Sequence, residues 1–239
     1  MGYGLSDRGG TSTRSECGPR DMNAENVSVT RKYEAHDLLR LSALPSAPDH
    51  PPWLAAAFAD APFAVVRRAL APPGFVAVGF RGPSRSDRYA ALIARDSVLS
   101  VTPPEALIRR CPSPGRAALK AFAALRRIAE QGGLESLVWG PTGSVGFELA
   151  TAHPAVTETS DLDLSIRAPL PLIRAHAHAL RERLSDVGRE FGLRIDAQLE
   201  TPAGGIALNE WIEGKPRVLA RSASGPSLVD DPWANAIFS

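Results

Sequence analysis

The stretch Ser160-Asp161-Leu162-Asp163-Leu164 places two aspartates at alternate positions, with a leucine after each of them. A β-strand sends residues i and i+2 to the same face, so both carboxylates point one way, about 6–7 Å apart along the strand. The two leucines point to the other face, where they can be buried. Two carboxylates on one rigid edge suit a hard divalent cation, which prefers oxygen ligands. The stretch therefore predicts a strand over residues 159–166 that carries a metal site at Asp161 and Asp163.

A Gly-Ser turn precedes the aspartates, at Gly143-Ser144. Such a turn can bring backbone N–H groups and a hydroxyl close to a phosphate. It is not a P-loop, because no Gly-Lys-Ser/Thr follows it. The turn and the aspartates together predict metal-dependent transfer of a nucleotide-like group.

A third carboxylate follows in the segment 193–199, which alternates strictly between apolar and polar residues, as a strand buried on one face does. Asp196 lies on the polar face of this segment. If the segment lies beside the aspartate strand, Asp196 joins the other two carboxylates. Three carboxylates can hold two Mg²⁺ ions about 3.5–4 Å apart, clamping the attacking and leaving oxygens of an in-line displacement.

The composition excludes several broad classes of protein. The chain has 239 residues, of which 44% are hydrophobic and 22% charged, which suits one large or two small domains with a real core. Its net charge of +1 gives no bulk attraction to nucleic acid or membrane. No apolar run approaches the ~18 residues of a membrane span, and the N-terminus lacks the apolar core of a signal peptide. The two cysteines, Cys17 and Cys111, form no metal-ligand pattern, so a cytoplasmic protein is expected.

The distribution of proline and glycine predicts the domain organisation. Residues 1–30 are rich in polar residues and glycine, which indicates a disordered tail or a misassigned start. Pro112-Ser113-Pro114-Gly115 is the predicted boundary between a small N-terminal domain, residues 31–112, and a catalytic domain, residues 116–239. Helices and strands are mixed along the chain, so the predicted class is α+β.

The expected elements follow from periodicity and turn signals. Helices are predicted over 53–58, 101–109, 116–130 and 170–191, the last closed by Gly192; strands are predicted over 64–68, 75–80, 137–139, 159–166, 193–199, 206–212 and 217–220; residues 88–94 fit either type.

Two groups of basic residues are candidates for binding a phosphate-rich substrate. Arg81, Arg85 and Arg88 surround a Gly-Pro-Ser turn, and arginine grips phosphate bidentately. The alternative for them is a solvated loop. Lys215 and Arg217 flank the last predicted strand at alternating positions, so they share a face that either reaches the cleft or protects an exposed sheet edge with charge.

The order strand, Gly-Ser turn, short helix, Asp-x-Asp strand, helix, Asp strand resembles the nucleotidyltransferase fold of the polymerase-beta type. Two blocks, WGPTGSVGFELAT (139–151) and VTETSDLDL (156–164), further resemble the malonate decarboxylase holo-acyl-carrier-protein synthase family, also called phosphoribosyl-dephospho-CoA transferase. The lead-in Gly140-Pro141-Thr142 departs from the shorter approach of many relatives. Weaker marks of the same family are HDLL (36–39), VVRR (65–68), GFRGPSRS (79–86), NEW (209–211) and GPSL (225–228).

This resemblance implies a reaction and roles for the residues. The donor would be 2′-(5″-triphosphoribosyl)-3′-dephospho-CoA, and a serine of the apo acyl carrier subunit of malonate decarboxylase would attack its α-phosphorus, releasing diphosphate. Asp161 and Asp163 would hold Mg²⁺, with two ions expected. Gly143 and Ser144 would meet the departing phosphates, and Asp196 would be the third ligand or the base.

Three alternatives stay open at this point. One is a nucleotidyltransferase that uses an ordinary NTP on another acceptor. Another is a non-catalytic chaperone that binds the carrier, against which the three retained carboxylates argue. The third is a different carrier, because the related citrate lyase system uses the same prosthetic group.

Overall fold

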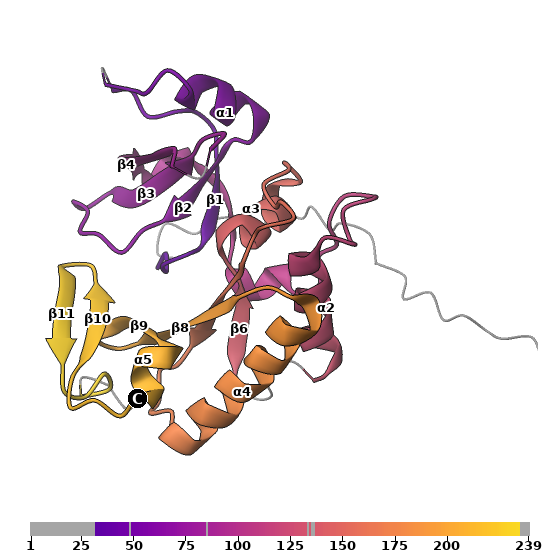
Figure 1. The fold of residues 1–239 in the computed structure, drawn as a ribbon. Helices are drawn as coiled ribbons and strands as arrows, with labels where there is room; N and C mark the ends of the chain where they lie inside the picture. Colours follow the sequence, from indigo (N-terminus) through magenta and orange to yellow (C-terminus); the bar gives the residue numbers. More distant parts are fainter. Residues whose placement is uncertain (1–31, 48, 85, 133, 135–136, 235–239) are drawn as a thin grey trace, which may run out of the picture.

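The computed structural model describes residues 32–47, 49–84, 86–132, 134 and 137–234. The predicted tail at 1–30 and the candidate Arg85 lie outside these ranges. The described chain is a mixed α+β structure with two β-sheets, one from each half of the sequence (Figure 1). This matches the predicted class.

The N-terminal sheet is fully antiparallel, in the order β4-β3-β2-β1-β5. One short helix, α1, packs against this sheet through Leu54 and Phe58. The rings of Phe58 and Phe80 meet edge-to-face, with their centroids 6.3 Å apart. The elements of this half are β1 (Leu38–Leu41), α1 (Leu54–Asp60), β2 (Phe63–Val66), β3 (Phe75–Arg81), β4 (Arg88–Ala94), η1 (Arg95–Ser97), β5 (Val98–Thr102) and η2 (Pro104–Leu107).

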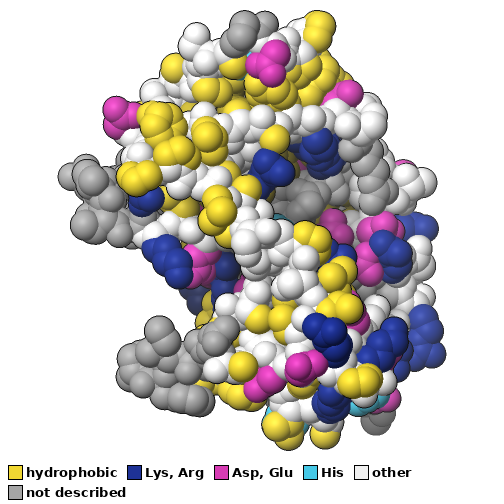
Figure 2. All heavy atoms as spheres, turned by 90° about the vertical axis from the view of Figure 1, so that its left-hand side faces the viewer, with side chains coloured by type: hydrophobic (Ala, Val, Ile, Leu, Met, Phe, Trp, Pro, Cys, Tyr) yellow, Lys and Arg dark blue, Asp and Glu magenta, His cyan; other side chains and the backbone are white. Residues whose placement is uncertain are grey.

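Large apolar side chains remain exposed on the N-terminal sheet. Phe75 on β3 and Leu92 on β4 are examples, at 45% and 44% exposure. Figure 2 shows hydrophobic side chains gathered over the upper part of one face, at the height of this domain in Figure 1.

The C-terminal sheet has the order β11-β10-β9-β8-β7-β6. All its neighbours are antiparallel except β7 and β8, which run parallel and are joined by the crossover helix α4. The elements are α2 (Lys120–Glu130), β6 (Val138–Pro141), α3 (Gly143–Thr151), β7 (Leu162–Arg167), α4 (Arg174–Phe191), β8 (Ile195–Thr201), β9 (Gly204–Ala207), α5 (Leu208–Ile212), β10 (Val218–Ser222) and β11 (Gly225–Val229).

Helix α4 is amphipathic, and its sequence explains its position. Ala177, Leu180, Leu184 and Val187 recur every three or four residues and are buried. The helix ends at Gly192, which takes the left-handed conformation with φ 63°, as the sequence predicts. Helices α2 and α4 contact each other and pack against the sheet (Figure 1).

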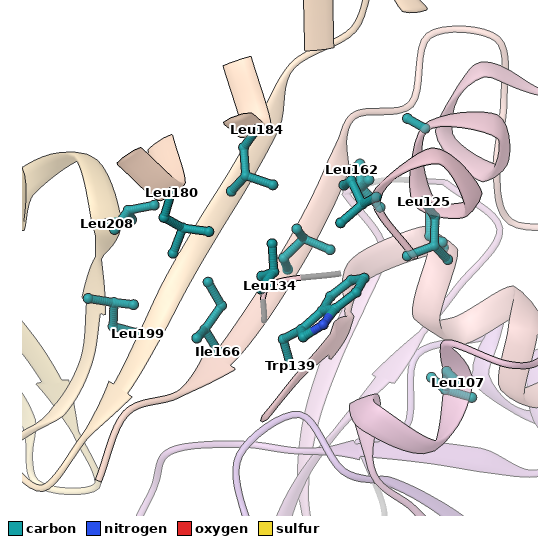
Figure 3. Packing of buried hydrophobic residues seen from close by; sticks show 14 of the residues in the cluster. Leu107, Leu125, Leu134, Trp139, Leu162, Ile166, Leu180, Leu184, Leu199 and Leu208 are labelled. Atoms are coloured by element: carbon teal, nitrogen blue, oxygen red, sulfur yellow. The ribbon is translucent and has the colours of Figure 1, made fainter. Parts of the chain in front are cut away.

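The main apolar core lies between these helices and strands β6 to β8. Figure 3 shows leucines of α2, α4, β7 and β8 converging around Ile166 and Trp139. Leu162, Leu164 and Ile166 are all buried, so β7 is the central strand of this core. Burial of one face of β7 fixes its register, and with it the positions of the aspartates.

The two halves are joined by apolar and ionic contacts. Leu38 of β1 and Ala61 after α1 belong to the same apolar cluster as β7. Arg68 forms an ion pair with Glu200 of β8, and Arg167 of β7 contacts Glu34 at 2.9 Å. Burial raises the pKa of Glu200, but contact with His36 and the charge of Arg68 outweigh burial, so this pKa lies below its ordinary value.

Most predicted elements are confirmed, and residues 88–94, which fit either type, form a strand. Two predictions are wrong. The predicted strand 206–212 holds only for its first two residues, because β9 ends at Ala207 and helix α5 follows from Leu208. The predicted helix 101–109 is the end of strand β5 followed by a single 3-10 turn. Strands β1, β5 and β11 escape prediction as strands, and their length is not the reason, since β2 and β6, with four residues each, are predicted.

Truncating the central strand tests the core. Ile166→Ala is expected to lower the free energy of unfolding by about 2–4 kcal/mol, because Ile166 is fully buried and its truncation leaves a cavity in the core. Val138→Ala on the neighbouring strand is the control, since Val138 is 51% exposed and should cost well under that amount. Urea unfolding at equilibrium measures both; equal losses would contradict the assignment of β7 as the core strand.

Candidate active site

The Gly-Ser turn begins helix α3 directly after strand β6. Gly143 has a φ of +58°, in the left-handed region that glycine adopts without strain. A Cβ at Gly143 would collide with Oδ2 of Asp163, so a side chain cannot fit there while that carboxylate stays in place. The N–H of Thr142 also donates to the carbonyl oxygen of Asp163 at 2.8 Å. The start of α3 is thus held against the aspartate strand.

Gly140 and Gly146, the other glycines of the segment 139–151, each allow close packing against a different part of the backbone. A Cβ at Gly140 would collide with the backbone of Pro104, so Gly140 allows β6 to approach the turn that connects the two domains. A Cβ at Gly146 would meet the carbonyl oxygen of Pro141 at 2.5 Å. Of the glycines at 140, 143 and 146, Gly143 is therefore the one that lies against Asp163.

The three predicted carboxylates lie at one edge of two neighbouring strands. Asp161 directly precedes β7, and Asp163 is its second residue. Strand β8 lies parallel to β7, with Asp163 and Asp196 as register partners, so the condition set by the sequence is met. Arg194 contacts Oδ2 of Asp196 at 2.5 Å and Oδ2 of Asp161 at 3.9 Å. A positive charge thus already lies between two of the carboxylates.

A cleft of about 680 Å³ opens between the two domains at this point. Gly143, Ser144, Asp161 and Asp163 line its C-terminal side. Its other walls come from helix α1, from the turn between β3 and β4, and from the loop that follows α3. These walls are lined by Ala56, Ala57, Asp60, Ala61, Arg81, Gly82, Pro83, Arg88, Arg116, Phe147, His153, Pro154, Ala155, Val156, Thr157, Thr159 and Ser160.

Two of the predicted arginines line the cleft. Arg81 donates to the carbonyl oxygen of Ala155 at 3.3 Å and lies over the ring of Phe147, 5.9 Å from its centroid. Arg88 donates to the carbonyl oxygen of Asp87 at 2.9 Å. Both bring positive charge from the N-terminal domain to the wall opposite Gly143 and Ser144.

Lys215 and Arg217 are not brought to this cleft. Lys215 contacts Glu213 at 2.5 Å, and Arg217 contacts Asp230 at 3.3 Å. Both side chains are more than half exposed, and neither is among the residues that line the cleft. Strand β10 is separated from β8 by β9, which explains the distance from the aspartates.

Arg116 is a cleft residue that sequence reasoning missed. Its guanidinium forms a bidentate ion pair with Glu148 of α3, which is only 1% exposed. Oε2 of Glu148 also accepts from the N–H groups of Ala155 and Val156, at 2.7 and 2.8 Å. Arg116 in turn donates to the carbonyl oxygen of Val156 at 2.7 Å. This network fixes the loop between α3 and the aspartate strand.

The network also determines the charge of Glu148. Burial raises the pKa of Glu148, but the hydrogen bonds from Arg116, Ala155 and Val156 outweigh burial, so the pKa lies below its ordinary value. Glu148 is therefore an ionised carboxylate inside the core. No sequence pattern links it to Arg116, because the two residues are 32 positions apart.

The donor set fits a divalent cation that is completed by a substrate. Across the described ranges, no three His, Cys, Asp or Glu side chains are close enough to form a metal cage by themselves. Mg²⁺ is commonly bound by one or two carboxylates together with substrate phosphates and water. Asp161 and Asp163 face the same cleft as Gly143 and Ser144, so they are the two carboxylates that could hold such a cation.

The chain has a two-domain α+β fold, and a helix start and two aspartates line one cleft between the domains. This combination is typical of transferases that act on phosphate groups. Two family models match the chain: the phosphoribosyl-dephospho-CoA transferase MdcG N-terminal domain over residues 34–104, and its C-terminal domain over residues 107–232. The chain belongs to the phosphoribosyl-dephospho-CoA transferase family. The models meet between residues 104 and 107, whereas the boundary predicted at residues 112–115 stays a prediction.

Similar proteins support this membership. The chain is 44% identical over 202 residues to a phosphoribosyl-dephospho-CoA transferase of Pseudomonas putida strain GB-1, covering 83% of this chain and 94% of that protein. It is 43% identical over 201 residues to that of Pseudomonas aeruginosa, covering 84% and 93%. Its identity to that of Azotobacter vinelandii is 43% over 188 residues, covering 77% and 85%. No solved structure matches the chain significantly. Among the described residues, no helix combines the length and apolarity needed to cross a membrane.

Gly143→Ala tests the contact between the helix start and Asp163. We expect about a 100-fold loss of transfer rate, because the added Cβ would displace the Asp163 carboxylate from the start of α3, and a misplacement of about 1 Å in a catalytic site can cost about that much. Gly115→Ala is the matched control, because Gly115 also has a positive φ, of +83°, but a Cβ added there would have no other atom within 4 Å. Both variants carry about 1–2 kcal/mol of left-handed strain. If the two variants lose transfer rate equally, the left-handed strain, and not the contact with the Asp163 carboxylate, accounts for the loss.

Glu148→Gln tests the buried network through its pH dependence. A carboxylate with a lowered pKa stabilises the fold fully above its unfolded pKa, and this stabilisation is lost as the pH falls through its folded pKa. At pH 7 the variant is expected to be less stable by about 2–3 kcal/mol. The difference from the wild type should shrink as the pH falls below about 4. Denaturant unfolding from about pH 3.5 to 7 measures this; a difference independent of pH would contradict the role of the charge.

Proposed function

We propose that this transferase moves the phosphoribosyl-dephospho-CoA group from 2′-(5″-triphosphoribosyl)-3′-dephospho-CoA to a serine of the apo acyl carrier subunit of malonate decarboxylase, with release of diphosphate. Family membership over both domains supports the reaction. The observation that carries the residue assignment is that Gly143 and Ser144 line the same cleft as Asp161 and Asp163. A cytoplasmic location stays a prediction from the sequence.

The leaving phosphates bind at the start of α3. Backbone N–H groups at a helix start point outward and carry partial positive charge, so they suit phosphate oxygens. Ser144 adds a hydroxyl at the same point. Arg81 and Arg88 line the cleft and supply positive charge for a triphosphate, whereas the charge of Arg116 is compensated by its ion pair with Glu148. Charge that develops on the departing diphosphate is stabilised by groups already in position.

Asp161 and Asp163 hold Mg²⁺ in this proposal, and Asp196 is a third ligand or the base that accepts the serine proton. When bound, the cation supplies charge neutralisation at the transferred phosphorus. Carboxylates and phosphates repel each other in the same cleft, so a cation is the group that lets an anionic donor approach these aspartates. The arrangement of β6, α3, β7, α4 and β8 supports a polymerase-beta-like fold for the C-terminal domain.

Intact mass spectrometry of the carrier tests the reaction. The protein is incubated with Mg²⁺, triphosphoribosyl-dephospho-CoA and the apo carrier. We expect a mass gain equal to the phosphoribosyl-dephospho-CoA group, reduced at least ~100-fold in rate by Asp161→Asn, which removes a cation ligand. Asp230→Asn is the control, since Asp230 is 84% exposed on the surface of the same domain.

The other outcomes distinguish the alternatives. Transfer from ATP or CTP alone, without a carrier, would favour an ordinary nucleotidyltransferase. Binding of the carrier with no mass gain and no response to Mg²⁺ would favour a chaperone. Undiminished transfer by a folded Asp161→Asn variant would remove that aspartate from the site.

A further inference from the structure

A second hollow, of about 740 Å³, lies on the other side of Asp161. It is formed by one face of α4, the start of β8 and the start of α5, all within the C-terminal domain. In Figure 1, α4 lies on the side of the sheet away from the N-terminal domain. The hollow is lined by Glu158, Thr159, Ser160, Asp161, Arg181, Leu184, Ser185, Gly188, Arg189, Gly192, Leu193, Arg194, Ile195, Asp196, Ala197, Leu208 and Asn209.

The hollow and the interdomain cleft meet at one short segment. Thr159, Ser160 and Asp161 are the residues common to both linings. Gly143 and Ser144, at the start of α3, line only the cleft, whereas Arg181, Arg189 and Arg194 line only the second hollow. Asp196 lines only the second hollow and not the cleft. The two hollows are therefore chemically different spaces on either side of Asp161.

In-line displacement requires the attacking and leaving oxygens to lie on opposite sides of the phosphorus. If the diphosphate leaves into the cleft beside Gly143, the attacking hydroxyl approaches from the side of Asp196. The second hollow is the space on that side. Its lining offers hydroxyl and amide groups at Ser160, Ser185 and Asn209 and apolar side chains at Leu184, Leu193 and Leu208, a mixture that suits a short stretch of polypeptide.

We propose that the second hollow receives the serine-bearing segment of the carrier subunit, an inference that rests on the proposed function. Donor and acceptor then enter from opposite sides of Asp161. The serine Oγ forms a bond to the α-phosphorus, while the bond from that phosphorus to the oxygen bridging the β-phosphorus breaks. The electron pair leaves with the diphosphate into the cleft, and the hydroxyl proton passes to the Asp196 carboxylate.

The location also suits a macromolecular acceptor. The cleft is lined by residues of both domains, whereas the hollow is lined by residues of the C-terminal domain, among them the exposed Arg181, Ser185 and Arg189 of α4. Arg181 and Ser185 lie one turn apart on this helix, and Arg181 is exposed, so the pair forms the outer rim of the hollow. A protein can contact this rim without entering the interdomain cleft.

Two variants at the rim test the assignment. Ser185→Arg fills part of the hollow, and Arg181→Glu reverses its charge. Each is expected to raise the KM for the apo carrier at least tenfold, while the Kd for the donor, measured by calorimetry without carrier, changes less than twofold. Arg126→Glu is the control, since Arg126 is a 63% exposed arginine on α2 that lines neither hollow. Circular dichroism checks that all three fold.

The outcomes separate this inference from the proposed function. If the wild type modifies the carrier and both rim variants keep its KM, the docking assignment is wrong while the reaction stands. A donor Kd weakened as much as the carrier KM would mean that the hollow binds donor instead. If the wild type gives the carrier no mass gain, the reaction and the docking assignment both fail.

Discussion

The contact between Gly143 and the carboxylate of Asp163 couples the two halves of the candidate site. Without a side chain at Gly143, the start of α3 lies directly against strand β7, and the Thr142 N–H bond to the Asp163 carbonyl locks their relative position. Helix starts attract anions and carboxylates repel them, so the two features face an anionic substrate with opposite signs. In the proposed function, a cation offsets the carboxylates. The close packing places the helix start and the Asp163 carboxylate on the same cleft, which is the arrangement that this proposal uses.

The N-terminal domain completes the cleft and does not merely precede the catalytic domain. Arg81, Arg88 and helix α1 form one wall, and without them the helix start and aspartates would face open solvent. Leu38 of the first strand is buried in the core of the C-terminal domain. The ion pair between Arg68 and Glu200 adds a polar tie across the same junction. The geometry of the cleft thus depends on both sheets keeping their relative position.

Local patterns predict the elements well, whereas contacts between distant residues escape them. Alternation predicts the aspartate strand and its parallel neighbour, because burial of one face imposes a period of two. The prediction for 206–212 is wrong from Leu208 onward, since so short a segment has no period long enough to separate strand from helix. Lys215 and Arg217 flank β10 as expected, but an intervening strand keeps them from the cleft. The pair Arg116 and Glu148 carries no local signal, because only the fold brings these residues together.

Asp161 lies between the loop that Glu148 fixes and strand β7. The segment before it is held by Glu148 through the N–H groups of Ala155 and Val156, and the segment after it is held by the register of β7. Its backbone therefore has little freedom, although its side chain borders two open spaces. A carboxylate fixed between two hollows can hold one group toward each of them without moving. Under the proposed function and docking, the donor and the carrier occupy the two hollows on either side of Asp161, with no rearrangement of the aspartates required.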